Sequence, residues 1–297
     1  MGFSTQLRTE VSLGIEAGAC TDVGRIRNNN EDSYRLSGEL GLFVLSDGMG
    51  GMASGEVASR LTVDTIEAHC CEAEADSSLA LIGNRSPGLS EAANRLASAV
   101  RLANRAVREA AVQSTSGEKD SSHAGMGATV VAARISEGRL SLAHVGDSRA
   151  YRLRSNVFEQ LTRDHSFVAE QVRRGILTEE EASRSNLQNV LTRALGVEAE
   201  VEVDVVEQRI VEGDTLLLCS DGLTRELSDS QIAGALESVK DAEQASELLV
   251  DLANQAGGGD NITAVVLRCG PKRLQGFARI GRLGKRLMKS RSIRTRN

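Results

Sequence analysis

The sequence predicts an α+β fold in which helices cover the outer faces of antiparallel sheets. Two observations lead to this prediction. Short strand-like segments follow one another across tight turns, as in β-hairpins, and pairs of helix-like segments interrupt them without regular strand–helix alternation. The chain has 297 residues, 40% of them apolar, so it is long enough to bury a sizeable core.

The expected strands are short apolar segments bounded by turn residues. The segment that ends at Asp47 is a nearly continuous apolar run, which is typical of a buried strand. Turns at Ser136-Glu137-Gly138 and Ser155-Asn156 indicate two hairpins. In chain order the strands are expected at residues 11–22, 40–47, 129–135, 140–145, 150–153, 157–161, 201–211, 215–220 and 261–268.

The expected helices lie between these strands. Ser90 can cap a helix whose apolar residues, from Ala92 to Val107, recur at three- and four-residue steps. Two short helices at 167–174 and 179–185 form an insertion between strands. In chain order the helices are expected at residues 56–70, 90–113, 167–174, 179–185, 230–238 and 241–256.

Charge is spread unevenly along the chain. The net charge is −6, yet residues 272–296 contain ten Lys or Arg and no acid, which leaves −16 for the rest. An acidic body suits a protein that collects cations better than one that binds nucleic acid. Aromatic residues make up only 2% and Trp is absent, so an aromatic platform for bases is not expected.

The best partition is one domain over residues 1–269 and a basic tail over 270–297. In the tail, apolar residues recur at helical steps between Lys and Arg. Such a helix can lie on an anionic membrane or bind an acidic partner, and a disordered solubilising end is an equally good interpretation. Five cysteines without metal-ligand spacing, no signal-peptide pattern and no long apolar run predict a cytoplasmic protein.

Four acidic positions stand out by their context. Asp47 and Asp221 each end an apolar run and precede glycine, Asp260 follows three glycines, and Glu31-Asp32 follows a polar run. A buried carboxylate is costly unless a positive charge compensates it, so these acids are expected to share a divalent cation. Oxygen ligands alone favour Mg²⁺ or Mn²⁺ over Zn²⁺. The alternative, that Asp-Gly merely marks a tight turn, explains one such pair better than it explains the set.

These residues carry a family resemblance. Arg27, Glu31-Asp32 and Asp47-Gly48-Met49-Gly50-Gly51 resemble the metal-dependent protein phosphatases of the 2C type in their bacterial form. Further blocks that look like the family follow in order: Gly127-Ala128-Thr129, Val145-Gly146-Asp147-Ser148-Arg149, Leu161-Thr162-Arg163-Asp164-His165-Ser166, Ser220-Asp221-Gly222-Leu223 and Gly259-Asp260-Asn261-Ile262-Thr263. The ordered set spans about residues 20–268 and is specific, although each block alone is weak.

The resemblance implies a four-layer α-β-β-α sandwich with two central, mostly antiparallel sheets flanked by helix pairs. It also implies two Mn²⁺ or Mg²⁺ ions, with a third, weaker one in bacterial members. The implied metal residues are Asp47 as the bridge, Asp221 and Asp260 at the first ion, Glu31 and the Gly48 carbonyl at the second, Asp32 behind them, and Asp147 with Asp221 at the third.

The activity implied is hydrolysis of phosphoserine and phosphothreonine in proteins by metal-activated water. Arg27 is implied to bind the substrate phosphate, because a guanidinium can contact it through two nitrogens. Met49 stands where animal members have a histidine proposed as general acid, so the proton donor is not identified. The expected partners are phosphoproteins and a eukaryotic-like (Hanks-type) Ser/Thr kinase, and the protein is expected to be monomeric.

Two other functions were weighed. A non-catalytic phosphoprotein-binding module on the same fold would be marked by a lost metal ligand, and no ligand position is lost here. A two-metal nuclease or phosphodiesterase, with the basic tail on nucleic acid, is disfavoured by the acidic body and the scarcity of aromatic residues.

Overall fold

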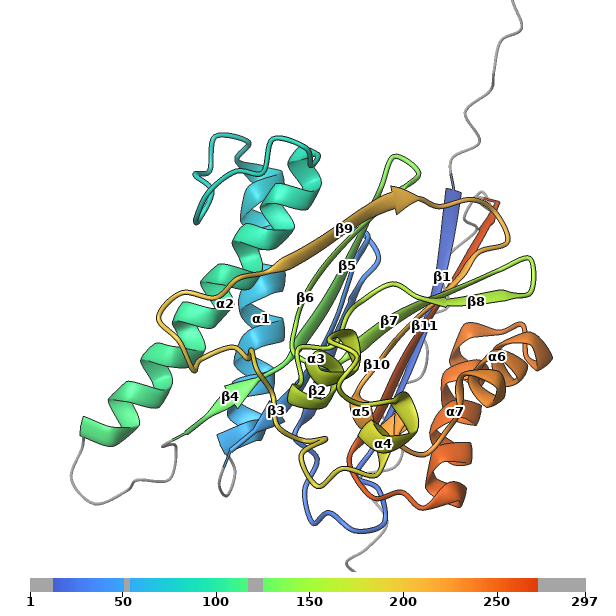
Figure 1. Ribbon diagram of the computed structural model, residues 1–297. Helices are drawn as coiled ribbons and strands as arrows, with labels where there is room; N and C mark the ends of the chain where they lie inside the picture. Colours follow the sequence, from blue (N-terminus) through green and yellow to red (C-terminus); the bar gives the residue numbers. More distant parts are fainter. Residues whose placement is uncertain (1–12, 51–53, 117–124, 272–297) are drawn as a thin grey trace, which may run out of the picture.

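The computed structural model describes residues 13–50, 54–116 and 125–271 of the chain. Within these residues two β-sheets lie face to face, and each carries a pair of helices on its outer side (Figure 1). The predicted four-layer α-β-β-α arrangement is confirmed, and every strand pairing in the described residues is antiparallel. Most of the tail, from residue 272 onward, lies outside the described residues.

The first sheet joins the two ends of the described chain. In spatial order its strands are β1 (Leu13–Asp22), β11 (Ile262–Pro271), β10 (Thr215–Cys219), β7 (Arg149–Arg154) and β8 (Val157–Gln160). The last strand therefore lies between the first strand and β10. Because β11 is central, it is buried along nearly its whole length, which matches the apolar run of its sequence.

The second sheet is built from the middle of the chain. In spatial order its strands are β2 (Asp32–Ser37), β3 (Leu42–Met49), β5 (Val130–Ser136), β6 (Arg139–Val145) and β9 (Asp204–Arg209), and the short β4 (Gly127–Ala128) pairs with the end of β3. The β5–β6 hairpin turns at Glu137 and Gly138, both with positive φ, as the predicted turn requires.

Two long helices cover the second sheet and two shorter ones cover the first. The helices are α1 (Ser54–Ala75) and α2 (Glu91–Ser116) on the second sheet, and α6 (Asp229–Ser238) and α7 (Ala242–Ala256) on the first. Ser90 caps α2 as predicted, since its hydroxyl accepts a hydrogen bond from the amide of Ala93. Leu96, Val100 and Val107 of its predicted apolar face are fully buried.

Between the sheets lies a third apolar layer. Phe43 and Leu45 of β3 face Leu216 and Leu218 of β10 in one buried cluster. Aliphatic residues fill most of this layer, as the scarcity of aromatic residues requires. The sheets are thus fixed against each other, and the loops at one end of both sheets are brought to a common place.

Two elements of the structure were not predicted. Strand β2 was not predicted, because its sequence Asp-Ser-Tyr-Arg-Leu-Ser has no continuous apolar run, and all its residues except Asp32 are only half-buried. The short helix α5 (Asp221–Thr224) was also missed. Strands β9 and β10 are consecutive in the chain but belong to different sheets. The insertion contains α3 (Phe167–Arg173) and α4 (Glu179–Ser183), close to the predicted bounds.

Candidate metal centre

A pocket of about 180 Å³ opens where the ends of the two sheets meet. Seven of the eight sequence-predicted site residues line it, namely Arg27, Glu31, Asp47, Gly48, Asp147, Asp221 and Asp260. The eighth, Asp32, is buried next to the pocket. The fold therefore brings acids more than 200 positions apart in the sequence to one pocket.

Asp47 is a buried carboxylate surrounded by other acids. It is opposite Asp32 in the β2–β3 register, and its backbone is fixed by Thr129, whose hydroxyl accepts from the Asp47 amide at 3.1 Å and whose own amide donates to the Asp47 carbonyl at 2.8 Å. Burial raises the pKa of Asp47 well above its ordinary value, and the nearby carboxylates of Asp32 and Asp221 raise it further. A cation at this position would remove that penalty.

Asp32 connects the two sheets. Its Oδ2 accepts hydrogen bonds from Ser220 Oγ at 2.8 Å and Thr263 Oγ1 at 2.6 Å, both of which belong to the first sheet's side of the pocket. Its other oxygen, Oδ1, is buried and has no hydrogen-bond partner within the described part of the chain. Burial raises the pKa of Asp32 to about 7, although the two hydroxyl donors act in the opposite direction. This oxygen can accept a hydrogen bond from a water in the pocket or coordinate an ion there.

Asp221 and Asp260 approach from the first sheet. Asp221 begins α5 one residue after β10, and its Oδ1 is buried without a hydrogen-bond partner among the residues that the structure describes. Burial raises the pKa of Asp221, while Arg225 lowers it. Asp260 precedes β11, where its Oδ1 accepts the Asn261 amide at 2.9 Å and its Oδ2 accepts Arg27 at 2.8 Å. The positions of both carboxylates are thus set by the ends of two neighbouring strands, β10 and β11.

Glu31 and Gly48 form the other side of the pocket. The Gly48 amide donates to the Glu31 carbonyl at 3.1 Å, and the Glu31 carboxylate packs against Gly55 in the first turn of α1. A Cβ on Gly48 would come within 1.9 Å of the Gly55 carbonyl oxygen, so only glycine fits here. Burial raises the pKa of Glu31. The close approach of three backbone segments leaves the Glu31 carboxylate facing the pocket.

Asn261 holds the loop that carries Arg27 and Glu31. Its side-chain oxygen accepts the Glu31 amide at 2.8 Å, and its side-chain nitrogen donates to the carbonyls of Val23 and Asn29. The sequence predicted no role for Asn261, although it lies in the motif Gly259-Asp260-Asn261-Ile262-Thr263. Its signal was weak, because an asparagine after aspartate usually marks a turn.

Asp147 lies in the turn between β6 and β7, beside the segment that contains α3 and α4. Burial raises its pKa to about 8, with Asp221 adding to the shift. The peptide before it is fixed by His165, whose Nδ1 accepts the Gly146 amide at 3.1 Å and whose own amide donates to the Gly146 carbonyl at 2.9 Å. Asn189 and Leu191, at the end of that segment, line the same pocket.

The donor set fits a hard divalent cation. Among the described residues, the pocket is lined by five carboxylates and by no His or Cys, and buried oxygens of Asp221 and of the adjacent Asp32 have no hydrogen-bond partner. Mg²⁺ and Mn²⁺ prefer such oxygen donors, and their charge would stabilise the ionised form of acids whose pKa burial raises.

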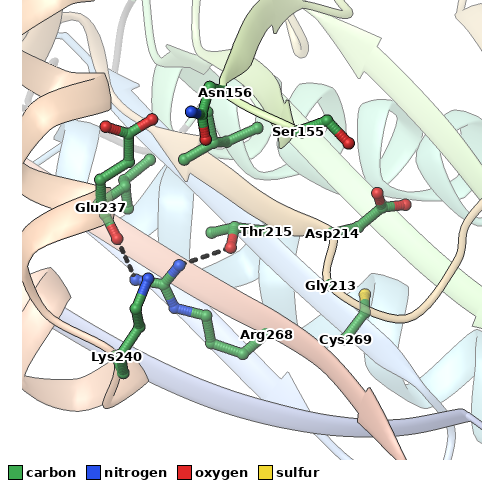
Figure 2. A pocket seen from close by; sticks show the side chains of 11 residues that line it. Ser155, Asn156, Gly213, Asp214, Thr215, Glu237, Lys240, Arg268 and Cys269 are labelled. Atoms are coloured by element: carbon green, nitrogen blue, oxygen red, sulfur yellow. Dashed lines mark hydrogen bonds between the residues drawn. The ribbon is translucent and has the colours of Figure 1, made fainter.

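Two other features were tested as alternative sites. A cavity of about 290 Å³ lies at the other end of the first sheet, where Figure 2 shows Arg268 beside Thr215. Two of its charged groups are already engaged, because Arg268 donates to Thr215 and to the carbonyls that end α6, and Asp214 pairs with Arg154. Among the described residues, the acids that line this cavity are only Asp214 and Glu237.

A second cluster combines His144, His165 and Asp204 within ligand distance of one another. The two imidazoles stack with centroids 4.7 Å apart, and Arg193 already supplies the positive charge through a 2.6 Å contact with Asp204. Burial lowers the pKa of His165 to about 4, so it is neutral at physiological pH. The two rings bond to backbone groups, His144 to the Arg163 carbonyl and His165 to the Gly146 amide, so this cluster fixes the base of the α3–α4 segment.

Arg225 was missed altogether by sequence reasoning. It lines the pocket and forms ion pairs with both Asp221 and Asp260, the latter at 3.2 Å. The available signal was its position four residues after Asp221, which places the two side chains together if a helix begins at that acid.

The fold and the pocket define a metal-dependent hydrolase of the α-β-β-α sandwich class, and comparison with known proteins identifies the family. Residues 25–257 match the family described as protein phosphatase 2C. The chain is 35% identical to the serine/threonine phosphatase stp of Listeria monocytogenes over 250 residues, which cover 83% of this chain and 93% of that protein. It is 38% identical to the serine/threonine protein phosphatase PstP of Mycobacterium tuberculosis over 257 residues, 86% of this chain and 45% of the relative.

Solved structures agree with the sequence comparison. The catalytic domain of PstP in complex with two manganese ions superposes with a TM-score of 0.72 at 36% identity, covering 87% of this chain and 100% of that one. The phosphatase Stp1 of Staphylococcus aureus superposes with a TM-score of 0.73 at 32% identity, covering 90% and 98%. This chain belongs to the protein phosphatase 2C family.

Proposed function

We propose that this chain removes phosphate from phosphoserine and phosphothreonine in proteins, with a water activated by two Mn²⁺ or Mg²⁺ ions. The observation that carries the proposal is the meeting of Asp47, Asp221 and Asp260 in one pocket beside Arg27. The family, the named phosphatase relatives and the relative solved with two manganese ions support it.

The carboxylates are proposed to hold the ions in the pattern that the family resemblance implies. Asp47 would bridge the two ions, Asp221 and Asp260 would complete one of them, and Glu31 with the Gly48 carbonyl would serve the other. The family resemblance also assigns Asp147, together with Asp221, to a third and weaker ion. When bound, the ions lower the pKa of water and offset charge on the phosphoryl oxygens. The buried oxygens without partners on Asp32 and Asp221 support this assignment.

Arg27 is proposed to bind and orient the substrate phosphate. Its side chain is half-exposed at the pocket and pairs with Asp260 at 2.8 Å, and that hydrogen bond is the main cause of its raised pKa. It therefore stays charged, and its remaining nitrogens are free to point toward solvent and an incoming phosphate. Met49 also lines the pocket but cannot donate a proton, so the proton for the leaving oxygen must come from a water or from another group.

The decisive experiment is phosphate release from a phosphothreonine peptide, with DNA and RNA nicking assays in parallel. Activity is expected to disappear in EDTA and to return with Mn²⁺ or Mg²⁺. Full activity after rigorous metal removal would refute the proposal. Nicking of nucleic acid without phosphate release would favour the nuclease alternative.

The cellular setting is proposed from the same family argument. A eukaryotic-like (Hanks-type) Ser/Thr kinase would supply the phosphoproteins, and the enzyme would act as a cytoplasmic monomer. Among the described residues, none of the helices combines the length and apolar character needed to cross a bilayer. Co-purified kinase substrates and light scattering would test these points.

The division into a phosphatase domain (1–269) and a basic tail (270–297) is likewise a proposal. A chain that ends at residue 270 is expected to keep peptide phosphatase activity. If the tail binds anionic membranes, only the full chain will sediment with phosphatidylserine vesicles. Equal sedimentation of both chains would contradict that role.

A further inference from the structure

Arg225 contacts the acidic pocket from inside the protein. Its guanidinium pairs with Asp221 and, at 3.2 Å, with Asp260 Oδ2, the same oxygen that accepts Arg27. The Arg225 side chain is only 27% exposed, and the two acids are 14% and 18% exposed. These are therefore not the weak, solvent-screened pairs of a protein surface.

The local fold fixes Arg225 in this position. Its amide donates to the Asp221 carbonyl at 2.9 Å as it ends α5, so the side chain points back to the start of that helix. The next residue, Glu226, accepts the Gly259 amide at 2.9 Å and thereby holds the glycine loop before Asp260. Arg225 is thus clamped between the two segments that carry its partners.

The charge of the pocket explains why an arginine belongs there. Six acids meet at or next to the pocket: Glu31, Asp32, Asp47, Asp147, Asp221 and Asp260. Two divalent ions would compensate four of these charges, which leaves two. Arg27 and Arg225 supply two positive charges in the same place. A buried cluster of this kind is tolerated only when its charges are matched.

Asp221 connects Arg225 with Asp147. Arg225 pairs with Asp221, and Asp147, buried in the turn between β6 and β7, lines the same pocket as both. Asp147 and Asp221 are the two acids that the family resemblance assigns to a third ion. The guanidinium therefore already compensates the charge of one of these two acids.

We propose that Arg225 is a built-in cation that takes the place of a further metal ion between Asp147 and Asp221, so that this chain binds two ions in the pocket and no third. The inference rests on the proposed function, because it assumes that the same carboxylates hold two ions. It replaces the expectation of a third, weaker ion that the family resemblance gave.

The test counts bound Mn²⁺ rather than turnover. Full-length protein and its Arg225→Ala, Arg225→Lys and Arg60→Ala variants would be titrated with Mn²⁺ by calorimetry and equilibrium dialysis. The native chain is expected to bind two ions. Arg225→Ala is expected to gain one weaker ion, and Arg225→Lys, which keeps the charge, is not. Arg60→Ala, which alters an exposed arginine on α1, should behave like the native chain.

A double variant identifies where the extra ion binds. Asp147→Asn in the Arg225→Ala background is expected to abolish the additional ion and leave the first two. Three ions in the native chain, or only two in Arg225→Ala with the fold verified by circular dichroism, would overturn the inference. A native chain that binds two ions yet releases no phosphate would instead defeat the proposed activity alone.

A role for Arg225 in gripping the substrate is an outcome the same variants can reveal. If Arg225→Ala raises the KM for a phosphothreonine peptide while the Mn²⁺ stoichiometry stays at two, the arginine binds substrate and does not replace an ion. If the stoichiometry rises and KM at saturating Mn²⁺ is unchanged, the built-in cation is supported.

Discussion

Asp32 and Asp47 are directly opposite each other in the register of β2 and β3. Acids in this relationship repel each other, and burial strengthens the repulsion. The fold retains both because hydroxyls from the other sheet bind one of them and the pocket exposes the second to a cation. Stability without metal is therefore lowered by the same residues that create the site.

Replacement of Asp47 by Asn is expected to abolish turnover and to stabilise the metal-free protein. The activity lost should be on the order of 10³-fold or more, because the ion centre supplies several kcal/mol of charge stabilisation. Removal of a buried charge should raise the free energy of unfolding of the metal-free form by about 1–3 kcal/mol. Phosphopeptide turnover and urea unfolding in EDTA measure the two effects.

The matched control is Asp251→Asn, which neutralises an exposed acid on α7. It should change neither quantity. If Asp47→Asn destabilises the metal-free protein instead, the prediction is wrong. The contacts of the Asp47 carboxylate would then stabilise the fold more than its repulsion by neighbouring acids destabilises it.

Arg27→Ala is expected to lower kcat/KM by on the order of 10²-fold, since a charged, two-nitrogen contact to phosphate is lost. Arg27→Lys should recover part of the loss, because the charge remains while the planar geometry does not. Steady-state kinetics with a phosphothreonine peptide and with a small aryl phosphate would compare the variants. An unchanged kcat/KM in Arg27→Ala would exclude the proposed phosphate contact.

Asp32→Asn should weaken metal binding without removing a direct ligand. A change in the groups behind a metal site typically costs about 10–100-fold in affinity or activity. Excess Mn²⁺ should therefore restore much of the activity of this variant, in contrast to Asp47→Asn. Ser33→Ala, which removes only a hydroxyl contact with Ser59, serves as the control. Failure of excess Mn²⁺ to rescue Asp32→Asn would argue for a more direct role.

The metal-free protein is expected to lose stability as the pH rises from about 4 to about 8. The acids Asp32 and Asp147 have ordinary pKa values of 3.8, and burial raises them to about 7 and about 8 in the folded state. The folded form thus holds protons that the unfolded form has released, at a cost of about 1.4 kcal/mol per pH unit for each such proton.

Urea unfolding in EDTA at a series of pH values measures this effect. The urea concentration at the unfolding midpoint should decrease as the pH rises from 6 to 8. Saturating Mn²⁺ should remove this decrease, because bound ions replace the protons. A midpoint that rises with pH in EDTA would show that these acids are already ionised in the folded, metal-free protein.

Much of the fold could be predicted because its strands carry strong local signals. The apolar runs before Asp47 and Asp221 and the hairpin turns at Gly138 and Asn156 appear in the structure near their expected bounds. Strand β2 could not be predicted, because its stability comes from pairing with β3 and packing between layers. The six residues of β2, which mix polar and apolar side chains, do not reveal this pairing and packing by themselves.

The candidate site was predicted in composition but not in electrostatic detail. Glycine beside an acid at the end of an apolar run located Asp47 and Asp221, and the structure brings them together with Asp260 in one pocket. Arg225 and Asn261 were not predicted, because each contacts a segment more than 30 residues away in the sequence. Arg225 pairs with Asp260, and Asn261 accepts the Glu31 amide. Neither residue type at those positions predicts such a contact by itself.

The central place of β11 has a consequence for synthesis on the ribosome. Among the described residues, β1 pairs only with β11, and Asp260 lies two residues before β11 begins. Strand β1 must therefore remain unpaired until nearly the whole described chain has left the exit tunnel. A chain truncated before Asp260 would lack both the partner strand of β1 and one carboxylate of the pocket.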